Sequence, residues 1–252
     1  MKHRIITGLV ALVAALTVSA QEAKVPFMDK GRPSQFMEVG VHFGLGASSI
    51  AQNYSTAIPD LSDFTFTPGV MMSFGATAKL PIRNYLAIGT GLDFNINNYF
   101  WNMTILHPQS GTLNALTQRH HFYDLSIPLT LDLRFNVSNN VRWDSEIGGY
   151  LTFGLSGRTR TTSYLSSINS LGQSQVTELT YRKDYYKEPD AIVNGVVNLD
   201  WGVHLATGLL IADHYSVKAV MHAGLRDIAR NFGVLDIHNH TLNVSFRVGY
   251  VF

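Results

Sequence analysis

The chain has 252 residues, of which 46% are hydrophobic and 15% are charged, and its formal net charge is +1. A charge content this low excludes a disordered chain, and the near-neutral balance does not support a nucleic-acid-binding protein. Twenty-one glycines, 14 Phe, 11 Tyr and no cysteine favour a β-rich protein that needs neither disulfides nor a zinc–thiolate site.

Residues 1–20 have the pattern of a secretory signal peptide. A short basic start precedes an apolar run of 14 residues, Ile5–Val18, and small residues follow it. A membrane-spanning helix needs about 20 apolar residues, so this run is too short for one. Cleavage would remove Lys2 and Arg4 and leave 17 basic against 18 acidic residues, a net charge of −1. We therefore expect an exported protein, with residues 21–34 as a periplasmic lead-in.

After residue 20 the hydrophobic residues alternate with polar or small ones, which is the period of a β-strand whose two faces differ. The last segment is the clearest, because Leu242, Val244 and Phe246 lie on one face and Asn243 and Ser245 on the other. The segments with this alternation are 37–45, 70–80, 86–96, 123–135, 141–155, 197–209, 215–226 and 240–252. Each is close to the 9–11 residues of a membrane-spanning strand.

The connections between these eight segments alternate in length. Three are short: 81–85, 136–140 and 212–214. Four are long: 46–69, 97–119, 157–196 and 228–239. An up-and-down barrel with short periplasmic turns and long extracellular loops has this pattern. We therefore expect an eight-stranded antiparallel transmembrane β-barrel over residues 35–252, with both termini periplasmic.

A soluble eight-stranded barrel is the alternative, but it would place its apolar residues inside and its charges outside. Here the polar face is crowded with Gly, Ser and Thr beside charges, as a narrow lumen requires. The apolar face also carries aromatic residues near both strand ends, where membrane barrels have interfacial girdles. These are Phe135, Trp143, Tyr215, Tyr250 and Phe252 at the turn end and Phe43, Phe94, Tyr123, Phe153 and Trp201 at the loop end.

The alternation predicts a lumen whose charges nearly balance, with seven acids and six bases. The predicted network is Glu38, Lys79, Asp93, Asp124, Asp132, Arg134, Arg142, Asp144, Glu146, Asp200, Lys218, Arg226 and Arg247, with His42, His204 and His222 as interior histidines. Eight strands enclose a space that side chains can fill. A balanced network in that space favours a plug over an ion-selective channel.

Two turns predict cross-strand pairs. The three-residue turn 212–214 sets paired residue numbers to a sum of 426, which places Asp200 opposite Arg226 as an ion pair and His204 opposite His222. The turn 136–140 leaves two registers open. One pairs Arg134 with Asp144, and the other pairs Asp132 with Arg142.

The enzyme hypothesis rests on histidines at the outer rim. His120 and His121 precede one strand, and His238 and His240 flank Asn239 before another. His-x-His suits a metal, but no carboxylate partner is placed by spacing, and no hydrolase, zinc-protease or phosphate-loop motif occurs. We therefore expect rim solvation, no enzyme activity, no metal and no cofactor.

The long connections are the candidate partner sites. The connection 157–196 is rich in tyrosine and mixed charge, which suits contact with proteins or glycans. Within it, Val176–Tyr181 has the pattern of a strand above the membrane. The connection 97–119 contains Tyr99, Phe100 and Trp101, which would dip into the interface or cap the lumen.

With its strands placed, the chain resembles the PorT-like outer-membrane β-barrel family, a group near the OmpA and OmpX barrels. The residues that carry the resemblance are the export signal ending at Ala20, the stretch Tyr123–Leu131 with Pro128 in mid-strand, and the terminal Tyr250-Val251-Phe252. The resemblance implies that Tyr250 and Phe252 are read by the barrel-assembly machinery. Because some members take part in protein secretion, it also suggests secretion-system proteins as partners.

Together these patterns predict a non-enzymatic outer-membrane barrel with a structural or interaction role. Its lumen is plugged by ion-paired side chains, and its loops contact partners. The alternatives are a narrow passive pore, an enzyme at the rim, and a secretion-associated barrel.

Overall fold

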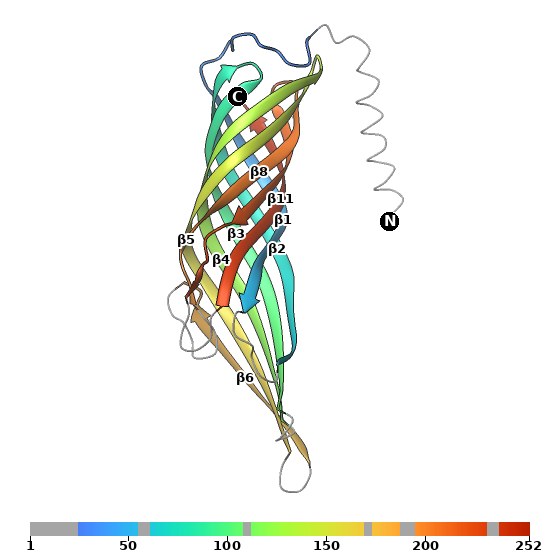
Figure 1. The fold of residues 1–252 in the computed structure, drawn as a ribbon, viewed down its shortest axis with the longest axis vertical. Coiled ribbons are helices and arrows are strands. Elements are labelled where there is room, and N and C mark those ends of the chain that lie inside the picture. Colours follow the sequence, from blue (N-terminus) through green and yellow to red (C-terminus); the bar gives the residue numbers. More distant parts are fainter. Residues whose placement is uncertain (1–24, 55–60, 108–111, 169–172, 187–194, 231–236) are drawn as a thin grey trace, which may run out of the picture.

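The computed structural model of the chain describes residues 25–54, 61–107, 112–168, 173–186, 195–230 and 237–252 (Figure 1). The predicted signal peptide, 1–20, lies outside these residues. Every regular element of the described part is a β-strand. No described helix is long and apolar enough to cross a membrane.

The strands run in chain order from β1 to β11. Their bounds are β1 Glu38–Tyr54, β2 Leu61–Arg83, β3 Leu86–His107, β4 Thr112–Ser138, β5 Val141–Ile168, β6 Ser174–Asp184, β7 Gly195–Val196, β8 Leu199–Ile211, β9 Tyr215–Gly224, β10 Ala229–Arg230 and β11 Ile237–Val251.

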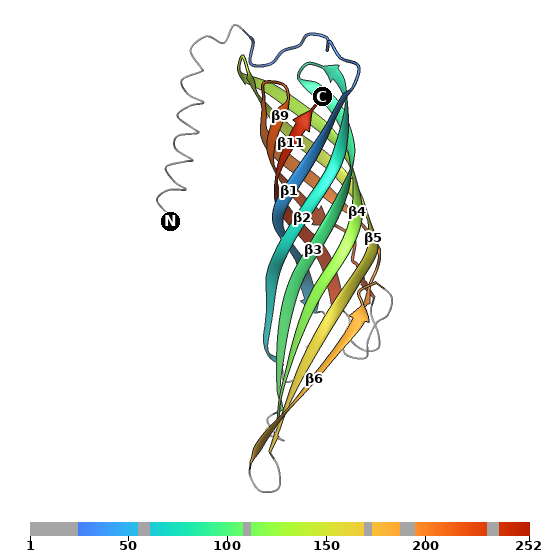
Figure 2. The ribbon, with the colours of Figure 1, turned by 180° about the vertical axis from the view of Figure 1, so that it is seen from behind.

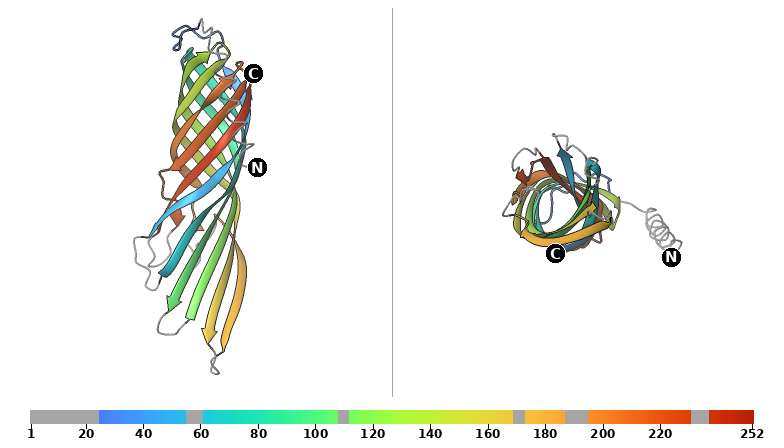
Figure 3. Two further views of the ribbon diagram at one scale, coloured as in Figure 1. Left: turned by 90° about the vertical axis from the view of Figure 1, so that its right-hand side faces the viewer. Right: turned by 90° about the horizontal axis from the view of Figure 1, so that it is seen from below.

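Nine of these strands form one antiparallel sheet that closes into a ring. Their order is β4-β3-β2-β1-β11-β9-β8-β5-β6, and an additional β4–β5 pairing closes the circle. Eight strands therefore make the wall, while β6 pairs with β5 alone. Figure 2 shows the tilted wall from β1 to β5, and the end view in Figure 3 shows the closed ring. The predicted eight-stranded up-and-down barrel is confirmed.

The sheet continues past the ring at the end opposite the short turns. β4 has 27 residues and β5 has 28, whereas about 9–11 suffice to cross a bilayer. β5 pairs with β8 over Val141–Phe153 and with β6 over Arg158–Ile168. The outer parts of β2 to β6 thus form a projecting extension (Figure 3).

Three of the predicted loops are corrected, because strands continue into them. Much of 46–69 belongs to β1 and β2, much of 97–119 belongs to β3 and β4, and the first part of 157–196 belongs to β5. The prediction of a strand at Val176–Tyr181 is confirmed, because these residues lie within β6.

The wall is apolar outside and polar inside. Along β4, Asp132 and Arg134 are buried, whereas Leu129 and Leu131 are exposed. A soluble barrel has the reverse distribution, so the burial pattern fits a wall whose solvent is lipid. This is the arrangement that the alternation predicts.

Aromatic rings gather at the turn end and at the loop end of the wall. At the turn end, the ring centroids of Phe135 and Trp143 are 5.9 Å apart and those of Tyr215 and Tyr250 are 5.5 Å apart. Towards the loop end, Phe43, Phe74 and Phe94 occupy one register row across β1, β2 and β3. The last two have centroids 5.0 Å apart.

The turn after β8 fixes its register with β9. Ala212 and Asp213 have φ values of 51° and 63°, and His214 N donates to Ile211 O at 3.2 Å. Two successive positive φ values define a type I′ turn, whose twist matches that of the flanking strands. The pairs run from Gly202↔Gly224 to Ile211↔Tyr215, so the predicted sum of 426 is confirmed.

Candidate functional site

The part of the lumen nearest the short turns holds an ionic layer. We call this part the lower lumen, although Figure 1 draws it at the top. Lys79 Nζ of β2 lies 2.5 Å from Asp132 Oδ2, 2.7 Å from Glu146 Oε1 and 3.0 Å from Asp144 Oδ2. Lys218 Nζ of β9 lies 2.6 Å from Asp144 Oδ2 and also contacts Glu146. Two ammonium groups therefore bridge three carboxylates within the lumen.

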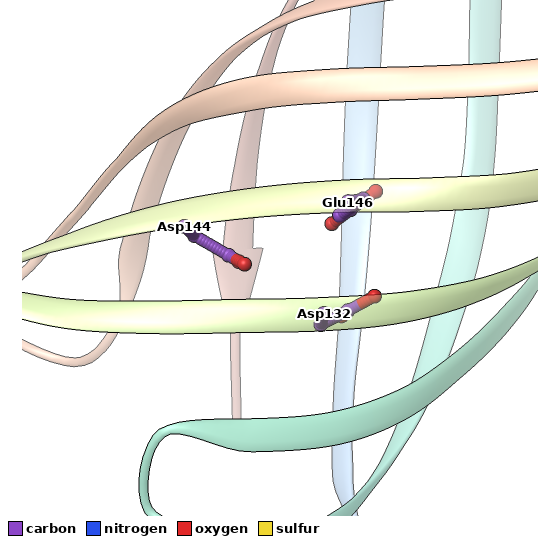
Figure 4. Close-up of side chains that lie close together, drawn as sticks. All are labelled: Asp132, Asp144 and Glu146. Atoms are coloured by element: carbon purple, nitrogen blue, oxygen red, sulfur yellow. The ribbon is translucent and has the colours of Figure 1, made fainter. Parts of the chain in front are cut away.

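Asp132, Asp144 and Glu146 lie close enough together to suggest a metal site. Figure 4 shows Asp132 on one strand and the other two on its neighbour. Lys79 Nζ contacts all three carboxylates, so a cation already holds the position that a metal would take. The cluster is better described as an ion-pair network.

Two arginines form further pairs across the lumen. Arg134 of β4 donates from Nη1 and Nη2 to the two oxygens of Glu38 on β1, each at 2.7 Å. Arg247 of β11 donates to Asp93 Oδ2 of β3 at 2.7 Å, and His42 Nε2 lies 3.1 Å from Asp93 Oδ1. In both cases two other strands of the wall separate the partners.

The three interior histidines join this network. His204 Nδ1 lies 2.8 Å from His222 Nε2, as the register predicts, and His204 Nε2 lies 3.3 Å from Glu146 Oε2. The ring of Tyr150 stacks on His222 with centroids 4.6 Å apart. The histidine pair thus links the ionic layer to the layer above it.

That middle layer contains Asp124 and Asp200. Asp124 accepts hydrogen bonds from Asn95 Nδ2 at 2.7 Å and Asn97 Nδ2 at 2.5 Å. Asp200 Oδ2 accepts from Thr241 Oγ1 at 2.6 Å. The donors of this layer are neutral.

The prediction of an Asp200–Arg226 ion pair is wrong, because the two side chains do not pair in the described part of the structure. β9 ends at Gly224, and Arg226 donates its backbone N–H to Trp201 O at 3.3 Å. The register is right but stops before it reaches Arg226. For the other turn, Arg134↔Asp144 is the observed register and Asp132 pairs with Glu146. Arg142 lies at the turn, where it contacts Asp213.

An aromatic layer fills the outer lumen. Its buried residues are Ile50, Tyr99, Trp101, Leu116, Phe122, Tyr185, Val196 and Ile228, with Tyr186 packed against them. Phe122 and Tyr185 stack with centroids 4.6 Å apart, and Tyr99 Oη lies 2.9 Å from Tyr185 Oη. Burial raises the pKa of Tyr185 well above its usual value. Of the two predicted roles of 97–119, capping is the one that Tyr99 and Trp101 match.

Glycines let the chain after β6 fold over this layer. A side chain at Gly154 would overlap the ring of Tyr186, and one at Gly157 would lie 2.7 Å from the Cβ atoms of Phe122 and Tyr185. Tyr185 N also donates to Gly157 O at 3.0 Å. From the sequence, the tyrosines of this connection were predicted to contact partners, and nothing in it indicated that two of them pack into the aromatic layer.

The rim histidines lie in separate environments. His120 is buried, with Nδ1 2.9 Å from Thr159 Oγ1, and His121 Nε2 lies 2.8 Å from Tyr123 Oη. His238 Nδ1 lies 2.6 Å from Asp227 Oδ2, a carboxylate partner that sequence spacing did not predict.

The Asp227 carboxylate connects the segment after β9 with β11. Burial alone would raise the pKa of Asp227, but the backbone N–H groups of Asn239 and Ala229 and the His238 side chain outweigh it, so the pKa is lowered. Asp227 Oδ1 accepts both backbone donors at 2.9 Å. These bonds join the segment after β9 to β11 and are typical of a structural carboxylate.

The lead-in crosses the mouth at the short-turn end. Asn84 N donates to Gly31 O at 3.2 Å, and Asn136 N donates to Phe27 O at 2.8 Å. Phe27 stacks on Phe135 with centroids 5.0 Å apart. Tyr250 lies near this end of the wall, facing outward.

A closed ring with a lipid-facing apolar surface and an ion-paired interior defines an integral outer-membrane β-barrel protein. The family model described as "Outer membrane protein beta-barrel domain" matches residues 20–230. Because the match covers more than half of the chain, the protein belongs to this family, and its place is the outer membrane. No curated protein sequence matches the chain.

Several solved structures are similar in fold. Ail of Yersinia pestis has 11% identity, with 86% of this chain and 100% of that chain covered and a TM-score of 0.33. OprG of Pseudomonas aeruginosa has 10% identity, with 89% and 99% covered and a TM-score of 0.38. An outer membrane channel from Pseudomonas putida F1 has 8% identity, with 91% and 100% covered and a TM-score of 0.30.

Proposed function

We propose that the protein is a non-enzymatic outer-membrane scaffold. Its lumen is closed by its own side chains, and its extension presents a surface to partners. The observation that supports closure best is the ionic layer, in which Lys79 of β2 and Lys218 of β9 bind carboxylates of β5, although other strands lie between them in the ring. Bonds between strands that are not neighbours resist the separation that a water path requires.

The extension supports the interaction role. Val176 and Leu179 of β6 are 63% and 53% exposed, and β6 pairs with β5 alone. Its side chains are therefore available to another molecule. The N- and C-termini lie on the periplasmic side in this proposal, residues 1–20 direct export, and Tyr250 and Phe252 serve the barrel-assembly machinery. A secretion-system partner would follow from the PorT-like resemblance alone.

Orientation is testable because the chain has no cysteine. Thr177→Cys on exposed β6 should react with a membrane-impermeant maleimide on intact cells. Asn140→Cys, at an exposed short turn, is the matched control and should react only after the outer membrane is opened. The reverse labelling would overturn the proposed orientation.

Single-channel conductance in a planar bilayer tests closure. We expect no stable openings from the full chain or from a variant in which Thr162 is joined directly to its partner Thr180, which shortens the extension. A third variant, Tyr185→Ala with Tyr186→Ala, removes two rings from the aromatic layer of the outer lumen and should also show no stable openings. Openings in the full chain would make the protein a pore, and openings only in the third variant would show that the ionic layer does not close the lumen.

A narrow pore is the second candidate, and two cavities favour it. One of about 150 Å³ lies at the short-turn mouth, and one of about 50 Å³ lies beside Lys79 and Lys218. Both are lined by Glu38 and Arg134, and both have room for water. If the protein is a narrow pore, these cavities would be parts of one water path that the Glu38–Arg134 ion pair interrupts.

A further inference from the structure

In the part of the chain that the structure describes, the middle lumen holds two buried carboxylates that no Lys or Arg side chain contacts. Asp124 is 4% exposed and Asp200 is 7% exposed. Among the described residues, neither forms an ion pair with Lys or Arg. Closer to the short turns, by contrast, Asp132 contacts Lys79 and Asp93 contacts Arg247.

Neutral donors surround both groups. Asp124 accepts from the amides of Asn95 and Asn97, and Asp200 accepts from Thr241 and from Tyr150 Oη, the latter at 3.1 Å. Such donors stabilise a carboxylate in its charged form but do not cancel its charge. Two negative charges buried without a Lys or Arg partner are costly.

The same layer has oxygen atoms without a donor. Asn95 and Asn97 are 1% and 0% exposed, and the Oδ1 atoms of both are buried and unpartnered. Because each amide also binds Asp124 through Nδ2, its Oδ1 lies beside that carboxylate, on the lumen side of β3. Asn243 Oδ1, on β11, is a third unpartnered acceptor. Three buried acceptor oxygens of this layer therefore have no donor, in addition to the two carboxylates that lack a Lys or Arg partner.

The two carboxylates belong to one arc of side chains. Ser126 Oγ lies 2.6 Å from Thr152 Oγ1 and 3.4 Å from Asp124 Oδ1, and Thr152 is paired with Asp200 in the β5–β8 ladder. The contacts from Asp124 through Ser126 to Thr152 thus lead to the ladder position of Asp200. Tyr186, which packs on Gly154 opposite Asp124 in the ladder, covers the arc from outside.

We propose that this arc binds one hard divalent cation, with Ca²⁺ as the best-fitting ion. The available atoms are carboxylate, amide and hydroxyl oxygens, which are the ligands of Ca²⁺ rather than of Zn²⁺ or copper. Two carboxylates supply the charge that one divalent ion neutralises, and the flexible coordination of Ca²⁺ suits oxygens from four different strands. The proposal is independent of whether the lumen conducts.

The test is to refold the full chain in detergent with CaCl2 or with a chelator, then to remove free ions and measure bound calcium. Because the arc lies beneath the aromatic layer, calcium must be present during refolding. We expect one Ca²⁺ per chain and a higher thermal unfolding temperature than in chelator. Asp124→Asn and Asp200→Asn should each weaken binding by roughly tenfold or more, because each removes a charged ligand.

Asp213→Asn is the matched control, since Asp213 is an exposed acid at the β8–β9 turn, and it should bind calcium like the parent chain. If the parent chain binds no calcium, or binds it equally well with both aspartates replaced, the proposal is wrong. Equal stabilisation by the same concentration of NaCl would also overturn the divalent assignment. The parent chain decides the matter even if a variant fails to fold.

Discussion

Replacing Lys79 with Met tests how strongly the ionic layer holds the barrel. Lys79 contacts three carboxylates, and Lys218 contacts only Asp144 and Glu146. Lys79→Met therefore leaves Asp132 buried without a cation among the described residues. Removing one partner of a buried ion pair costs about 3–5 kcal/mol, so we expect the free energy of unfolding to fall by about that amount.

The measurement is urea unfolding of the barrel refolded into lipid vesicles, followed by tryptophan fluorescence and by the electrophoretic shift between folded and unfolded chains. Adding Asp132→Asn to Lys79→Met removes the uncompensated charge. The double variant should therefore be more stable than Lys79→Met alone, which makes the coupling measurable as a double-mutant cycle.

Arg83→Met is the matched control because Arg83 is an exposed cation at the end of the same strand. Its change should stay within about 0.5 kcal/mol. A cost below about 1 kcal/mol for Lys79→Met, in a barrel that still folds, would refute the argument that the three carboxylates depend on Lys79.

Three further outcomes follow from the contacts at the outer end. Arg226→Ala should change stability by less than about 1 kcal/mol in the urea assay, because the side chain lacks the predicted partner. Gly154→Ala should displace Tyr186 and speed proteolysis of the outer end, whereas Gly149→Ala, whose new methyl would meet its nearest atom at 3.4 Å, should not. The pKa of Asp227 is lowered in the folded chain. Its hydrogen bonds therefore contribute fully to stability above the ordinary pKa of 3.8, and this contribution is lost as the pH falls through the lower pKa of the folded chain. The backbone amide of Asn239 should therefore be protected from hydrogen exchange near neutral pH and should lose this protection in acid. In Asp227→Asn, the protection of this amide should no longer depend on pH.

The barrel itself was predictable because lipid imposes a period of two on every spanning strand. Leu129 and Leu131 face lipid and Asp132 and Arg134 face the lumen, so the pattern is visible without a partner strand. Short turns then fix register, as at 212–214. The prediction for Arg226 failed because a register extrapolates only while the strand continues, and β9 ends at Gly224.

The extension was not predictable in the same way. Beyond residue 97 in β3, polar and aromatic residues stand on both faces of the strand, so the alternation in the sequence fades although the strand continues to His107. Contacts between two separate connections could not be predicted from the sequence either. The Asp227–His238 pair and the return of Tyr185 onto Phe122 depend on how two distant segments meet, which no local period encodes.

In the proposed scaffold, the ion pairs of the lumen join strands that are not neighbours in the ring. Lys79 joins β2 to β5, Arg134 joins β4 to β1, and Arg247 joins β11 to β3. None of these strand pairs are neighbours in the ring, so each bond joins strands that have two others between them. A path through the lower lumen would require the three cross-lumen links to break together, and each exposed charge would then need water in place of its partner. Variation in function is therefore easier to accommodate in the projecting strands β2 to β6, whose outer parts can change without disturbing the ion pairs inside the ring.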